Sequence, residues 1–141
     1  MLSGRQFLFV ALLFLVSCSK QETFVPVTLV SSEDKFGRTA SELRLFISLS
    51  GINLSTDIIQ NDVELYSVTY KTKYLGKSIV ASGLVILPKT ATPAGMVCFS
   101  HGTIASHAEA PSALPLNSTE LVFYTALASP GFIAVIPDFI G

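Results

Sequence analysis

The sequence has few of the residues from which several common kinds of site are built. It contains two cysteines and two histidines, and its nine lysine and arginine residues are scattered along a chain with a formal net charge of -1. A nucleic-acid surface needs a basic stripe, a metal centre needs grouped ligands, and a disulfide scaffold needs more cysteines. We therefore expect no nucleic-acid partner, no metal and no other cofactor.

The chain also lacks a recognisable catalytic nucleophile. It has no G-x-S-x-G sequence, which would place a serine on a sharp turn between a strand and a helix. The nearest match, GKSIV at positions 76–80, lacks the second glycine and falls in a predicted hairpin. Cys98 lies in an apolar run, where we expect a small buried side chain rather than a nucleophile. The 141 residues are also fewer than the roughly 250 that an open α/β sheet with its covering helices usually needs.

The N-terminal residues have the pattern of an export signal. After Arg5, residues 7–16 (FLFVALLFLV) form an apolar run that is too short to span a membrane as a mature helix. The run ends in LVSC at positions 15–18, which resembles the bacterial lipobox, whose cysteine is acylated and becomes the mature N-terminus. We expect residues 1–17 to be removed and Cys18 to hold the protein in the cell envelope, at the outer membrane. An ordinary secretory signal with Cys18 there by chance is the alternative.

A polar segment and a helix are predicted next. Residues 18–38 contain proline and glycine among polar residues and are expected to form a tether. A helix is predicted over residues 40–50, because Thr39 and Glu42 have the spacing of a capping box and Gly51 provides a stop.

Two stretches of alternating, β-branched and aromatic residues predict an antiparallel hairpin. They cover residues 63–74 and 78–87, with a turn around Gly76. One face of each strand is therefore expected to pack on a core.

The hairpin is followed by the pattern of a βαβ unit. A continuous apolar run at 96–100 predicts a short strand that is buried on both faces. Asn117, with Glu120 three residues further on, predicts the start of a helix, and residues 132–136 predict a second buried strand. An antiparallel hairpin followed by a βαβ unit is how the α/β-hydrolase fold begins. The expected fold class is therefore α/β, with residues 39–141 forming the N-terminal part of such a domain and an incomplete sheet.

Three motifs carry a resemblance to the α/β-hydrolase superfamily over residues 63–141. SHGT at 100–103 follows the first buried strand and resembles the HG-x oxyanion motif. EAPS at 109–112 resembles its continuation in bacterial esterases and secretory-lipase-like members, and ALASPGFIAVIPDFIG at 126–141 resembles the family's helix-glycine-strand-Pro-Asp passage. The chain thus resembles the N-terminal portion of a bacterial lipoprotein esterase.

The resemblance implies particular roles at the oxyanion motif. The Thr103 backbone N–H would stabilise the oxyanion that forms when an ester carbonyl is attacked, and Gly102 would let the backbone turn toward the substrate. His101 would support the loop, because the serine, acid and histidine of this fold come later in the chain. We therefore expect a fragment of a secreted serine hydrolase that acts on carboxylic esters, including acyl glycerols, and that is inactive as it stands.

Other interpretations remain open at this point. A non-catalytic, surface-anchored binding or structural lipoprotein would show the same HG sequence as a plain strand-ending turn. A peptidase of the prolyl-oligopeptidase type would share the fold. The expected partners are an ester or lipid substrate and a membrane reached through the lipid anchor. Asp138 is expected to cap or brace the next turn, and His107 to be a solvated loop side chain.

Overall fold

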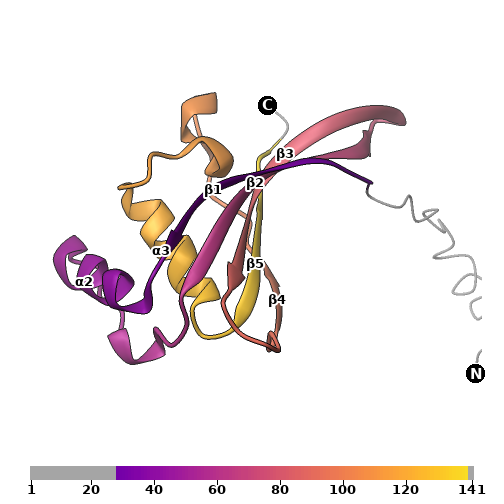
Figure 1. The fold of residues 1–141 in the computed structure, drawn as a ribbon. Helices are drawn as coiled ribbons and strands as arrows, with labels where there is room; N and C mark the ends of the chain where they lie inside the picture. Colours follow the sequence, from indigo (N-terminus) through magenta and orange to yellow (C-terminus); the bar gives the residue numbers. More distant parts are fainter. Residues whose placement is uncertain (1–27, 140–141) are drawn as a thin grey trace, which may run out of the picture.

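The computed structural model describes residues 28–139, which form a five-stranded sheet with the order β1-β2-β3-β5-β4 (Figure 1). The strands are β1 (Thr28–Arg38), β2 (Val63–Tyr74), β3 (Lys77–Pro88), β4 (Gly95–Cys98) and β5 (Phe132–Pro137). Neighbouring strands are antiparallel except β4 and β5, which are parallel. The α/β class, and the hairpin followed by a βαβ unit, are confirmed.

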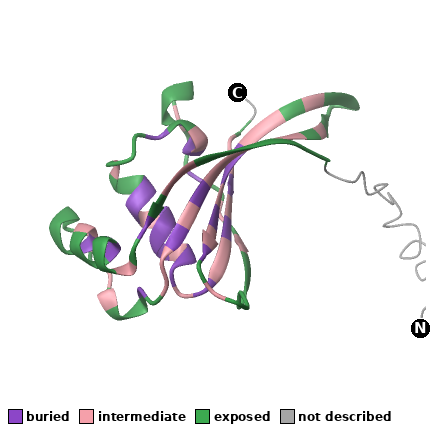
Figure 2. Ribbon diagram, in the orientation of Figure 1, coloured by how far each residue is buried: buried purple, intermediate pink, exposed green. Residues whose placement is uncertain are grey.

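The helices and the sheet enclose one core. Helices α2 (Ala40–Ser50) and α3 (Thr119–Ala128) contact each other, and α3 also packs on β3 and β5. Short 3-10 turns lie at η1 (Thr56–Ile58), η2 (His107–Glu109) and η3 (Pro111–Ala113). Figure 2 shows buried residues along α3 and on the strands beside it. The largest fully buried apolar side chains are Leu43, Ile47, Ile59, Leu65, Leu84, Ile86, Leu121 and Ile136. Each stabilises the fold by about 1.5–3 kcal/mol relative to an exposed position.

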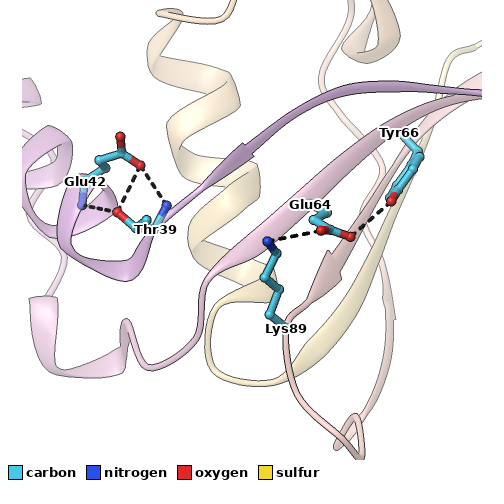
Figure 3. A network of polar contacts seen from close by, with 5 residues as sticks. All are labelled: Thr39, Glu42, Glu64, Tyr66 and Lys89. Carbon is cyan, nitrogen blue, oxygen red and sulfur yellow. Dashed lines mark hydrogen bonds and ion pairs between the residues drawn. The ribbon is translucent and has the colours of Figure 1, made fainter.

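Helix α2 begins and ends where its capping residues predict. The Thr39 hydroxyl oxygen accepts from the Glu42 N–H at 3.2 Å, and the Thr39 N–H donates to Glu42 Oε2 at 2.8 Å (Figure 3). Gly51 ends the helix with a φ of 72°, in the left-handed region that glycine adopts at no steric cost. Leu43 and Ile47 are the buried residues of the helix and face the core.

The prediction of a tether up to residue 38 is wrong for residues 28–38. These residues form β1, which pairs with β2 from Thr28↔Lys71 to Arg38↔Val63. Most of β1 is exposed, because it is an edge strand and its outer face carries polar side chains. A polar edge strand does not have the apolar alternation by which strands are recognised.

One helix boundary and the burial of one strand also differ from the prediction. Ser118, rather than Asn117, caps α3, accepting from the Leu121 N–H at 3.2 Å. Strand β4 is not buried on both faces: Met96 is 69% exposed and Cys98 is also exposed, so the expected burial of that thiol is wrong. Side chains project from the two faces of a strand, and Met96 and Cys98, two residues apart, share a face of β4 that the other described residues leave open.

The predicted signal peptide, Cys18 and the first part of the predicted tether lie outside the described residues. Within the described range, no helix is long and apolar enough to cross a membrane.

Candidate functional site

His101 lies just beyond the carboxyl end of β4 and is largely enclosed, with 7% of its surface exposed. Its Nδ1 atom is 2.7 Å from the carbonyl oxygen of Gly102. Because a carbonyl oxygen only accepts, this contact requires a proton on Nδ1, and in the neutral ring Nε2 is then an acceptor. Nε2 is buried without a partner among the described residues, and the ring packs on Phe139 with centroids 4.2 Å apart. The supporting role of His101 in the loop stays a prediction.

The backbone of the two residues that follow His101 is exposed to solvent. Gly102 and Thr103 are exposed, and neither N–H has an acceptor within residues 28–139. Gly102 does not have a positive φ, and nothing lies within 4 Å of the place where its Cβ would stand. The expected conformational reason for this glycine is therefore not observed. Its lack of a side chain instead leaves this stretch of backbone uncovered.

The predicted oxyanion motif borders two cavities. One, of about 550 Å³, is lined by residues 101–107 and Phe139. The other, also about 550 Å³, extends from the motif toward α3, where Glu120 and Tyr124 line it. Burial, and secondarily the charge of Glu120, raise the pKa of Tyr124, so its hydroxyl stays protonated at neutral pH. A ligand beside Thr103 has space on a largely apolar surface.

Ser112 and Asp138 hold the loop that contains the motif. The Ser112 N–H donates to Asp138 Oδ1 at 3.0 Å and the Ser112 hydroxyl to Oδ2 at 2.5 Å. The Asp138 N–H in turn donates to the carbonyl of Ser82 on β3 at 2.9 Å. Asp138 braces part of the chain as predicted, but its partner lies in the loop 26 residues earlier and not in the next turn. The EAPS and Pro-Asp sequences meet at this contact.

Side chains from β1 and β2 fix the other side of the same loop. Lys35 and Ser67 both donate to the carbonyl oxygen of Ser112, with a distance of 3.1 Å from Ser67. Arg38 is buried and donates to the carbonyl of Leu116. These contacts restrain the second half of the loop between β4 and α3.

Arg38 is held by aromatic rings and was not found from the sequence. Its guanidinium lies 5.0 Å from the ring centroid of Phe36 and 4.3 Å from that of Phe46. Burial lowers the pKa of Arg38, and the charge of Glu42 partly opposes that effect. Phe36 belongs to β1 and Phe46 to α2, so no pattern within one segment marks Arg38 for this contact.

Several candidates are not brought together. His107 is exposed in η2, as expected of a solvated side chain. No three His, Cys, Asp or Glu side chains among residues 28–139 are close enough to hold a metal ion. The described site therefore offers hydrogen-bond donors and space, while a nucleophile with its base is not among its residues.

No protein-family model and no curated protein matches the chain. A crystal structure from Legionella pneumophila, of a protein provisionally named a hydrolase, is similar with a TM-score of 0.66 and 26% identity. The match covers 80% of this chain and 30% of that one. The chain thus has a hydrolase-like α/β fold and spans about a third of its structural neighbour.

Proposed function

We propose that residues 101–103 form half of the oxyanion hole of a serine hydrolase that acts on carboxylic esters, with acyl glycerols among its substrates. The observation that carries the proposal is the Thr103 N–H, which is exposed and without an acceptor within the described residues, at the end of a strand and beside a cavity. Backbone donors in this position stabilise the negative charge that develops on an attacked carbonyl oxygen.

The surrounding contacts support this role because an oxyanion donor must be held in place before the reaction. His101 bonds to the Gly102 carbonyl, and the Ser112–Asp138 contact ties the loop to the end of β5. A donor held in this way needs no reorganisation as charge develops, and one such donor contributes about 10²–10³ in kcat.

The rest of the mechanism is proposed from the resemblance. A serine on the strand-to-helix elbow would attack the ester carbonyl, and its proton would pass to a histidine and then to the leaving alkoxide. None of these groups is among the residues described here, and the chain corresponds to 30% of its structural neighbour. We therefore expect residues 1–141 alone not to hydrolyse p-nitrophenyl esters above a buffer blank.

We also propose that the protein acts at the cell envelope. Acylation of Cys18 would hold the protein on the cell envelope, at the outer membrane, where lipid esters are available at the surface. The sequence LVSC at 15–18 supports it.

The test is made on the product of the complete reading frame that contains these residues, here called the complete protein. It should hydrolyse p-nitrophenyl esters, and Thr103→Pro, which removes the backbone N–H, should lower kcat by about 10²–10³. Thr103→Ala keeps the N–H and should retain activity within a few-fold. Absence of ester hydrolysis would support the non-catalytic lipoprotein instead, and equal losses in both variants would remove Thr103 from the mechanism.

A further inference from the structure

The outer end of the β2–β3 hairpin exposes apolar and cationic side chains together. Strand β5 pairs with β3 over Gly83–Ile86, and the hairpin projects beyond that region with the start of β1 beside it (Figure 1). Figure 2 shows much of this end exposed. We define the hairpin tip as Lys71, Lys73, Tyr74, Leu75 and Lys77, all of which are exposed.

Leu75 is a poor residue for its place in the fold. It occupies the turn with a φ of 49°, and Gly76 follows with a φ of 77°. Turns with two such residues favour asparagine, aspartate or glycine, because a larger L-residue is strained there. Leu75 is also 84% exposed. Neither backbone geometry nor packing within the described chain accounts for leucine at this position. An exposed apolar side chain there indicates a contact with another molecule.

The lysines make the same tip cationic. No aspartate or glutamate occurs in residues 65–108. On the neighbouring strand, Glu33 lies opposite Ser67, four residues or roughly 13 Å along β2 from Lys71. That separation exceeds the screening length of about 8 Å at physiological ionic strength. Glu33 therefore does not neutralise the positive charge of the hairpin tip.

We infer that the hairpin tip binds the surface of an anionic lipid bilayer. The lysines contact the lipid head groups while Leu75 and Tyr74 enter the interface, a region that suits an aromatic ring with a polar end. Each lysine near such a surface contributes about fivefold to the partition coefficient. This contact is separate from the ester site and does not depend on the hydrolase proposal.

The place at which the chain enters the domain is compatible with a hairpin tip that faces the membrane. Strand β1 begins at Thr28, opposite Lys71, so the chain enters the described domain at the same end as the hairpin tip. Cys18, the proposed lipidation site, is ten residues earlier, and ten residues of extended chain reach at most roughly 35 Å. A lipid at Cys18 and the hairpin tip can therefore engage one bilayer together.

The test uses the complete protein with Cys18→Ser, so that acylation does not drive binding. It is mixed with vesicles made of equal parts phosphatidylcholine and phosphatidylglycerol, or of phosphatidylcholine alone, and floated through a density gradient, in which aggregated protein stays below. Protein should float with the anionic vesicles, less so at high salt, and not with phosphatidylcholine. Equal flotation with both vesicles, or none with either, would overturn the inference.

Variants separate this contact from folding. Lys73→Gln should lower the partition coefficient about fivefold, whereas Lys89→Gln, at the opposite end of the hairpin, should leave it unchanged. Leu75→Asn should also weaken binding while the urea midpoint stays the same or rises, because asparagine suits the left-handed turn. Flotation that none of these changes affects would contradict the assignment of the tip.

Entry of the hairpin tip into the bilayer can be measured separately from binding. Residues 1–141 contain no tryptophan, so Leu75→Trp adds a reporter at the tip, and its emission is taken as the difference from the complete protein with leucine at position 75. Its emission should shift to the blue with anionic vesicles and be quenched by lipids with brominated acyl chains. Emission that is unchanged by vesicles to which the protein is bound would show that the tip does not enter the bilayer.

Discussion

Asp138 and Ser112 are joined by two hydrogen bonds that connect the end of β5 to the loop following β4. The carboxylate accepts from the Ser112 N–H at 3.0 Å and from its hydroxyl at 2.5 Å. The same serine carbonyl accepts from Lys35 and Ser67, so three strands hold one residue of the loop. This arrangement fixes the second half of the loop that begins with the proposed oxyanion motif.

Asp138→Asn should loosen that loop. A hydrogen bond to a charged group is worth about 1.5–3 kcal/mol, and the amide cannot accept both donors. We expect a fall of that size in the free energy of unfolding in urea, measured on the complete protein, with faster hydrogen exchange over residues 105–116. Asp34→Asn makes the same chemical change on an exposed side chain of β1 and should have little effect. Equal results for the two variants would show that the Ser112 contact does not restrain the loop.

The lipidation proposal is tested at Cys18. In a bacterial host, the unaltered protein should incorporate radiolabelled palmitate and fractionate with membranes. Cys18→Ser should abolish the labelling, because serine offers no thiol for acylation. Labelling that persists in this variant would remove the basis for the proposed anchor.

The exposed edge of β4 should promote association of the isolated 141-residue chain. An unpaired edge strand offers backbone N–H and C=O groups to another chain, and a charge on such a strand opposes that pairing. Met96→Lys should therefore reduce light scattering over time. Leu45→Lys is a matched control, because Leu45 is 59% exposed but lies on α2. Scattering reduced equally by both variants would indicate a general effect of charge instead of pairing through β4.

The contribution of the Glu64–Lys89 ion pair to the free energy of unfolding should change with pH in a direction that the pKa shifts determine. Hydrogen bonds from Lys89 and Tyr66 lower the pKa of Glu64, and Glu64 raises the pKa of Lys89 (Figure 3). The Glu64 contribution is present above its unfolded-state pKa and is lost as the pH falls through the lower folded-state value. The Lys89 contribution is lost as the pH rises through its raised folded-state value.

This dependence is measured as the difference in urea midpoint between the parent protein and Glu64→Gln. The difference should be small, because the side chains of Lys89 and Glu64 are 51% and 40% exposed and water screens their attraction. The difference in urea midpoint should become smaller in acid and again in strong base. A difference that stays constant from neutral pH into acid would show that the pair does not contribute to stability.

Elements whose signals are local could be predicted from the sequence. The capping box at Thr39 and Glu42 and the alternation of residues 63–74 are short-range patterns, and both elements occur where they predict. The motif at 100–103 could likewise be placed at the end of a strand. Strand β1 could not be recognised, because an edge strand in water keeps polar residues on its outer face.

The contacts that hold the candidate site depend on the order of strands in the sheet. Ser112 meets Asp138 across 26 residues and Lys35 across 77, and no pattern within either segment specifies these partners. The tertiary structure also decided the exposure of Cys98, which its apolar neighbours predicted to be buried, because the described residues leave that face of β4 open. The sequence by itself determined the helix, the hairpin and the motif, because hydrogen bonds and side-chain periodicity act over a few residues. Only the tertiary structure decided what holds the motif, because those partners are brought together by the pairing of distant strands.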